Sequence, residues 1–84
     1  MNYSLFILPR AQKELAQLNS GAFARVRDAI RELASNPRPP GSLKLTGRDA
    51  WRLRVGEFRV IYEIDDEHRL ITVLNVGHRR DVYR

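Results

Sequence analysis

The chain has 84 residues, no cysteine, and a net charge of +5 at pH 7. This length supports one domain with one modest core, so we assign residues 1–84 to a single domain. The sequence excludes disulfides and thiolate metal sites, contains no apolar run of about 20 residues that could span a membrane, and shows no secretory signal at its N-terminus. We therefore expect a cytoplasmic protein that uses no metal or other cofactor, and the positive charge favours a polyanionic partner.

The N-terminal third predicts a strand followed by a helix. Tyr3–Leu8 is a short apolar run, and its apolar residues on both faces predict burial on both sides. Pro9 suits the first position of a helix, because a proline there gives up no helical hydrogen bond. The apolar stripe of this helix consists of Ala11, Leu15 and Leu18. The helix should end at the polar residues 19–21, where Ser20 is the expected N-cap of the next helix.

The second expected helix covers residues 21–35 and has the clearest apolar periodicity in the chain. Its stripe, with three- and four-residue spacing, consists of Phe23, Val26, Ile30 and Leu33. Pro37 ends it, because the residue before a proline avoids the helical conformation. The break between the two helices is short, so we expect an antiparallel helical hairpin that covers the apolar face of a sheet.

The next segment predicts a loop and a β-hairpin. Residues 37–47 are rich in proline and glycine and form the loop, with a short extended piece at residues 43–45. Trp51–Ile64 alternates strictly around the dipeptide Gly56-Glu57, which suits a two-residue type II′ turn. This register places six apolar side chains on one face: Trp51, Leu53, Val55, Phe58, Val60 and Tyr62. Arg52, Arg54 and Arg59 share the other face.

A last strand is expected at Leu70–Val76, after a polar turn at residues 65–68, and Gly77 is expected to stop it. Its continuous apolar character predicts an interior position between the second hairpin strand and Tyr3–Leu8. The predicted fold is therefore a two-layer α/β (α+β) domain, with a helical hairpin on a mostly antiparallel four-stranded sheet. The elements follow in the order strand–helix–helix–strand–strand–strand.

The arginines of the hairpin allow two interpretations. Like charges directly across a strand pair repel one another, since their Cβ atoms lie only about 5 Å apart. The face is then either a solvated surface that carries spare charge, or an anion receptor in which guanidinium groups bind phosphate oxygens. The tail, HRRDVYR, is similarly either a frayed basic terminus or a set of titratable groups that joins Arg54 and Arg59.

The segments LKLTG, WRLRVGEFRVIYEI and VGHRRDVYR, in this order of elements, resemble the RelE/ParE toxin superfamily, and its RelE-like mRNA interferase branch in particular. The resemblance extends over essentially the whole chain. It implies that Arg59 holds the scissile phosphate and that Arg79 lies near the leaving group. It also implies that Tyr83 is the general base, with His78 as a second candidate for acid–base catalysis. Lys44, Arg52 and Arg54 stand at or near positions of RNA-contacting residues in relatives.

The function implied by the resemblance is that of the toxin of a type II toxin-antitoxin system. Such a toxin is a metal-independent endoribonuclease that cleaves mRNA on the ribosome, by attack of a 2′-OH on the adjacent phosphate. Its partners are mRNA and a cognate RelB-like antitoxin, through which the complex binds operator DNA; no membrane is involved. Two alternatives remain: a ParE-like toxin that binds DNA gyrase without nuclease activity, and a degenerate toxin that only binds its antitoxin.

Overall fold

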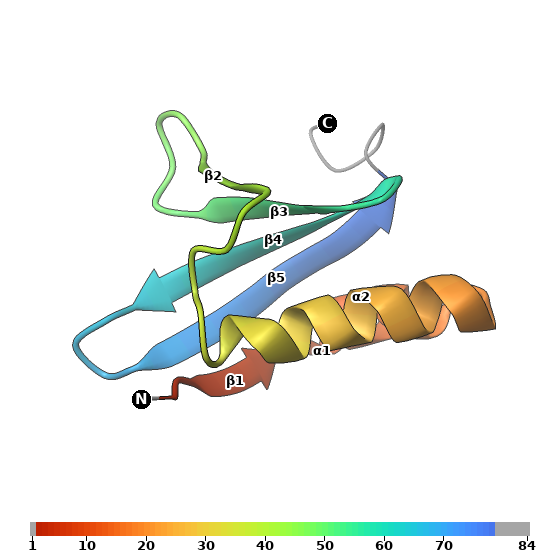
Figure 1. The fold of residues 1–84 in the computed structure, drawn as a ribbon, viewed down its shortest axis with the longest axis horizontal. Coiled ribbons are helices and arrows are strands. Elements are labelled where there is room, and N and C mark those ends of the chain that lie inside the picture. Colours follow the sequence, from red (N-terminus) through yellow and green to blue (C-terminus); the bar gives the residue numbers. More distant parts are fainter. Residues whose placement is uncertain (1, 79–84) are drawn as a thin grey trace.

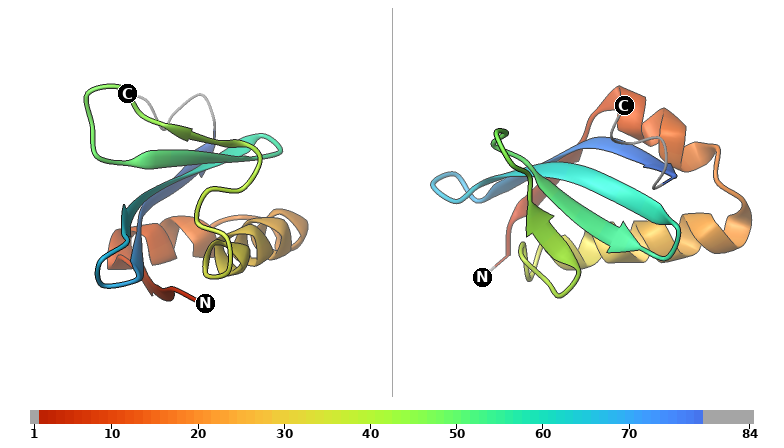
Figure 2. Two further views of the ribbon diagram at one scale, coloured as in Figure 1. Left: turned by 60° about the vertical axis from the view of Figure 1, so that its left-hand side comes forward. Right: turned by 90° about the horizontal axis from the view of Figure 1, so that it is seen from above.

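The fold is a five-stranded sheet with two helices packed on one face (Figure 1). A computed structural model describes residues 2–78. The strands are β1 (Ser4–Ile7), β2 (Ser42–Lys44), β3 (Trp51–Val55), β4 (Phe58–Asp65) and β5 (Leu70–His78), and the helices are α1 (Pro9–Ala16) and α2 (Ser20–Leu33). Figure 2 shows that both helices lie on the same side of the sheet. The predicted two-layer α+β class is confirmed.

The strands follow one another across the sheet in the order β1-β5-β4-β3-β2. Only the β1–β5 pair is parallel, so the sheet is mostly antiparallel, and β5 lies between β4 and β1 as predicted. The predicted count of four strands is wrong. Ser42–Lys44 pairs with β3 and adds a fifth strand at the edge. A three-residue strand has too few residues for its alternation to stand out from a loop.

Two further details of the strands differ from the prediction. β1 is an edge strand, and only one of its faces is covered by the helices: Leu5 and Ile7 pack against the core, whereas Phe6 is 51% exposed. The prediction that this segment is buried on both sides is therefore wrong. Gly77 does not stop β5, which continues to His78 because both residues pair with β4.

The helix boundaries depend on local capping. Pro9 is the first residue of α1, as expected. The N-cap of α2 is Asn19 and not Ser20: the Oδ1 atom of Asn19 accepts a hydrogen bond of 2.9 Å from the backbone N–H of Ala22. Both residue types are good N-caps, so composition alone does not choose between neighbours. Neither helix of the described residues is long and apolar enough to cross a membrane.

The core lies between the helices and the apolar face of the sheet. Its buried residues are Ala11, Leu15, Val26, Ile30, Leu33, Leu53, Val60, Tyr62, Ile71, Val73 and Val76. Tyr62 is fully buried, and its hydroxyl donates a 2.8 Å hydrogen bond to the carbonyl oxygen of Pro37. Burial raises the pKa of this phenol. The predicted helix stripes and the predicted apolar face of the hairpin are thus confirmed as the two sides of the core.

The β3–β4 hairpin has the predicted register. Trp51 pairs with Tyr62, Leu53 with Val60 and Val55 with Phe58. Gly56 has a φ of +60°, and among the described residues other than glycine only Arg69 has a positive φ. Glu57 therefore has a negative φ, which is the pattern of a type II′ turn.

A β-bulge interrupts the β4–β5 pairing. Ile61 pairs with Asn75 and Tyr62 pairs with Val73, so Leu74 has no partner in β4. An extra residue reverses the alternation of the strand beyond it. Val73 and Val76 consequently both face the core, although they are three residues apart, and both are buried.

β5 extends past β1, and a helix satisfies part of the edge left open. β1 ends at Ile7, which pairs with Val73. Further along, the backbone N–H of Val76 donates a 2.8 Å hydrogen bond to Oε1 of Glu14 on α1. The carboxylate takes the place of a strand at this position, so the end of β5 is held to the helical layer.

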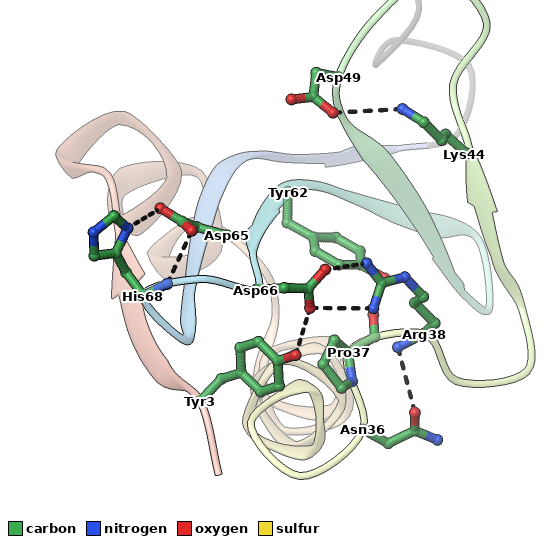
Figure 3. A network of polar contacts seen from close by, with 10 residues as sticks. All are labelled: Tyr3, Asn36, Pro37, Arg38, Lys44, Asp49, Tyr62, Asp65, Asp66 and His68. Atoms are coloured by element: carbon green, nitrogen blue, oxygen red, sulfur yellow. Dashed lines mark hydrogen bonds and ion pairs between the residues drawn. The ribbon is translucent and has the colours of Figure 1, made fainter. Parts of the chain in front are cut away.

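A polar network joins three distant segments at the opposite end of the sheet (Figure 3). The Tyr3 hydroxyl donates to Oδ1 of Asp66, and Arg38 donates to both carboxylate oxygens, at 2.8 Å to Oδ2. The Arg38 guanidinium also lies 5.2 Å from the ring centre of Trp51. Asp66 therefore links the N-terminus and the α2–β2 loop to the β4–β5 turn.

We expect Asp66→Asn to lower the thermal midpoint at pH 7 and to have less effect in acid. The hydrogen bonds from Arg38 and then Tyr3 hold the pKa of the Asp66 carboxyl below its ordinary value of 3.8. A carboxyl with a lowered folded-state pKa stabilises the fold above its unfolded pKa, and this contribution is lost as the pH falls through the folded pKa. The difference in midpoint between wild type and variant should therefore shrink as the pH is lowered from about 4 toward 2.

Glu67→Gln is the matched control, because Glu67 is an exposed acid in the same turn. It should show no comparable loss at pH 7. A wild-type-minus-Asp66→Asn difference that stays constant from neutral pH to acid would contradict the role given to the ionised carboxyl.

Candidate functional site

Three arginines lie on the sheet face that the helices do not cover. Arg54 of β3 pairs directly with Arg59 of β4, and Arg59 pairs in turn with Gly77 of β5. Arg52 lies one residue pair further from the turn, opposite Ile61. We call the surface formed by Arg52, Arg54, Arg59, Ile61, Asn75 and Gly77 the arginine face. The two-residue turn at Gly56 determines that these arginines lie next to one another.

The arginines differ in how firmly they are held. Arg54 is exposed, whereas Arg52 and Arg59 are half-buried and their Nε atoms are shielded from solvent. The stems of these two side chains therefore lie against the protein, and their guanidinium groups have fewer orientations available than that of a free surface arginine. Such pre-positioned cations can bind an anion at a smaller cost in side-chain entropy.

The charge on this side of the sheet changes sign along β4. Arg59 is near the Gly56 turn, whereas Glu63 and Asp65 follow at the other end of the strand, on the same face by alternation. A hollow of about 480 Å³ at the acidic end is lined by Asp49, Glu63, Ile64, Asp65, Asp66, Leu70 and Thr72. An anionic ligand is therefore attracted to one half of the face and repelled from the other.

A larger hollow, of about 720 Å³, lies elsewhere on the described residues. It runs along α1 and is lined by Pro9, Arg10, Gln12, Lys13, Glu14, Ala16 and Gln17. It contains no residue of the arginine face. Clustered charge and held side chains, which bear directly on chemistry, distinguish the arginine face from this hollow.

Lys44 does not lie on the arginine face. It pairs with Trp51, and paired residues point to the same side of a sheet, so the register assigns Lys44 to the Trp51 side. Its Nζ atom lies 3.5 Å from Oδ1 of Asp49 (Figure 3). It also donates a 3.3 Å hydrogen bond to the carbonyl oxygen of Arg48. That Lys44 contacts RNA remains a prediction, and such a contact would come from the edge strand β2.

His78 is also directed away from Arg59. It pairs with Phe58, and the two rings meet edge to face with their centres 5.9 Å apart. Phe58 belongs to the apolar face of the hairpin, so the imidazole lies on the opposite side of the sheet from the arginines. This placement argues against a proton transfer by His78 beside Arg59. Arg79 and Tyr83 themselves lie outside the described residues.

Sequence reasoning missed the contribution of β5 to the arginine face. It treated Leu70–Val76 as a continuous apolar strand, and so gave Asn75 no role and gave Gly77 only that of ending the strand. The bulge at Leu74 turns both residues toward the arginines. The available signal was a single asparagine in an otherwise apolar run, a residue type that is depleted in strands.

Comparison with known proteins adds to this description. Residues 5–83 match the family model of the ParE toxin of type II toxin-antitoxin systems. The chain is 33% identical over 86 residues to the toxin RelG of Mycobacterium tuberculosis, covering 100% of this chain and 99% of RelG. The archaeal RelE–RelB complex of Pyrococcus horikoshii superposes with a TM-score of 0.85 at 27% identity, over 98% of this chain and 100% of the matched one. The RelBE2 toxin-antitoxin complex of M. tuberculosis superposes with a TM-score of 0.83 at 27% identity, over 94% of this chain and 100% of the matched one.

We expect Arg54→Gln to stabilise the fold at low ionic strength. The substitution removes a like charge directly opposite Arg59, an effect of about 0.2–1 kcal/mol for a cross-strand pair. Salt screens exposed charges, so the gain should fade as salt is added. Urea unfolding at low and high salt measures it. Arg25→Gln, at an exposed position of α2, is the control, and an Arg54→Gln effect that is independent of salt would contradict the repulsion.

Proposed function

Because the chain belongs to the RelE/ParE superfamily of toxins of type II toxin-antitoxin systems, and to its RelE-like branch, we propose that it is an endoribonuclease that cleaves mRNA on the ribosome. The observation that carries the proposal is the direct pairing of Arg54 with Arg59, with Arg52 beside them. Guanidinium groups gathered in this way suit the phosphate oxygens of a polyanion.

The reaction we propose uses the 2′-OH of the RNA as its nucleophile. The 2′-oxygen loses its proton and forms a bond to the adjacent phosphorus, and the bond from phosphorus to the 5′-oxygen breaks. The products are a 2′,3′-cyclic phosphate and a 5′-OH, which takes up a proton. This chemistry needs a proton acceptor, cations around the pentacovalent phosphate and a proton donor for the leaving oxygen.

Arg59, supported by Arg54, holds the negative charge that develops on the phosphate. The resemblance to the family assigns the proton acceptor to Tyr83 and places Arg79 near the leaving group. A tyrosine has an ordinary pKa near 10, and neighbouring guanidinium groups favour its ionised form. His78 is the weaker candidate, since its ring meets that of Phe58 edge to face on the opposite side of the sheet from Arg59.

The ribosome enters the proposal because the arginines supply charge but do not by themselves orient a flexible RNA. Neither of the two hollows described above is lined by Arg52, Arg54 or Arg59. The acidic end of this sheet face, which contains Glu63 and Asp65, repels the RNA backbone and keeps the RNA on the basic end. A message held on a ribosome arrives already oriented, which lowers the entropic cost of reaction.

We also propose a RelB-like antitoxin as the partner of this chain. The Pyrococcus horikoshii structure is a complex of RelE with RelB, and the Mycobacterium tuberculosis structure is the toxin-antitoxin complex RelBE2. An acidic or amphipathic antitoxin segment would neutralise the arginine face and keep RNA from it. The complex would bind operator DNA through the antitoxin, and the released toxin would act in the cytoplasm.

The alternative is a toxin that binds DNA gyrase and cleaves nothing. It is favoured by the family model, which is that of a ParE toxin. Inducing the chain in cells separates the two functions: the proposal requires messages cut at defined positions with intact DNA, and the alternative requires DNA breaks with intact messages. Neither lesion is expected of a degenerate toxin that only binds its antitoxin.

We expect Arg59→Ala to lower the cleavage rate by about 10²–10³-fold, as is typical when one transition-state donor is removed. Cleavage of ribosome-bound message, followed over time with excess toxin, measures this step. Arg31→Ala is the matched control, because Arg31 is an exposed arginine of α2 in the other layer. It should cleave at the wild-type rate, and an equal loss in both variants would point to general charge instead of a phosphate site.

A message with one 2′-deoxy sugar on the 5′ side of the cleaved phosphate should resist cutting, because the nucleophile is missing. Gel analysis of end-labelled message on ribosomes tests this, with the 2′-deoxy sugar moved three nucleotides away as the control. Cleavage of the substituted position at the normal rate would show that water or another group attacks the phosphorus.

A further inference from the structure

Asn75 is the one polar, uncharged side chain of the arginine face. The face consists of two rows of paired residues, the first with Arg54, Arg59 and Gly77, and the second with Arg52, Ile61 and Asn75. Asn75 therefore lies on the strand next to Arg59, one residue pair along. Such diagonal neighbours are about 7–8 Å apart, a distance that a single nucleotide can bridge.

The bulge at Leu74 is what brings Asn75 to this position. Without it, residues 71, 73 and 75 would alternate onto one side, and the Asn75 amide would enter the core beside Ile71 and Val73. With it, Val76 occupies the core position and is 3% exposed, while Asn75 faces the arginines. Bulges of this kind often redirect side chains next to functional sites.

The side chain of Asn75 is partly exposed. Among residues 2–78 it makes no hydrogen bond. Its neighbour on the same face, Gly77, contributes no side chain between Asn75 and the end of β5. A half-buried amide gains most from a partner that also excludes water.

The chemistry of an amide complements that of the arginines. Arg52, Arg54 and Arg59 bind charge and suit the phosphates, which are the same in every nucleotide. An amide both donates and accepts hydrogen bonds, and this pattern distinguishes one base edge from another. A nucleotide whose phosphate lies on Arg59 would bring its base toward Asn75.

We propose that Asn75 contacts the base of a nucleotide adjoining the phosphate held by Arg59, and so determines part of the sequence preference of cleavage. This inference rests on the proposed function. It makes Asn75 a substrate-contacting specificity residue with no part in the proton transfers. Removing its amide should therefore change which messages are cut, more than how well an average message is cut.

The experiment compares wild type with Asn75→Ala on ribosomes programmed with messages in which the two nucleotides flanking the cleaved phosphate are varied one at a time. Asn75→Ala should cut the preferred message about three- to tenfold more slowly, as expected for one lost hydrogen bond. The cleavage rates of the other messages should change less, so the ratio of the rate on the preferred message to the rates on the others should fall. Asn75→Thr, which suits a strand, gives a second variant should the alanine protein fold poorly, and thermal unfolding checks both.

Thr72→Ala is the matched control, because Thr72 lies on β5 and pairs with Glu63 at the acidic half of the face. It should keep the wild-type ratios. Three outcomes would overturn the role of Asn75: Asn75→Ala lowers the cleavage rate equally on every message, it lowers the rate on none, or the wild type shows no preference among the messages. In each case cleavage by the wild type would still uphold the proposed function.

A wild-type protein that cuts no message would instead overturn the proposed function. The same nucleotides are then compared in short oligoribonucleotides by equilibrium binding. A loss of affinity in Asn75→Ala that is confined to one base identity upholds the base contact, and a uniform loss or no loss overturns it.

Discussion

The pairing register of the β3–β4 hairpin is the constraint on which both the core and the arginine face depend. Side chains alternate along a strand, so the register that buries Leu53, Val60 and Tyr62 also turns Arg54 and Arg59 outward together. A slip by one residue would expose the apolar set and bury the arginines, which would cost far more than their mutual repulsion. The core thus enforces an arrangement of charges that the arginines alone would avoid.

The two faces of the sheet consequently have different roles. The helices α1 and α2 cover one face and provide the stability, while the other face has charges that are arranged by position along β4. Contacts at the rim support this division: Glu14 holds the end of β5 to α1, and Asp66 joins three segments at the far end of the sheet. Neither contact belongs to the arginine face, yet both limit the movement of strands that carry it.

The sequence predicted the features that depend on strong local patterns. Two helices with clear apolar stripes, a hairpin with a two-residue turn, and the side of the sheet taken by the arginines all follow from periodicity. It did not predict features that depend on tertiary partners. The edge position of β1 and the pairing of β2 are set by neighbours distant in sequence. The sides taken by Lys44 and His78 follow from pairings and from a bulge, and apolar runs do not reveal a bulge.

The bulge at Leu74 also bears on how this chain tolerates changes in length. Deleting one residue there would restore regular alternation and exchange the two sides of everything that follows in β5. Val76 would leave the core, and Asn75 and Gly77 would leave the arginine face, although no other residue had been altered. An exposed loop such as residues 46–49 can change in length without reversing which side chains face the core. Homologues of this chain should therefore vary in length at the β2–β3 loop and keep an unvarying residue count between the β4–β5 turn and the end of β5.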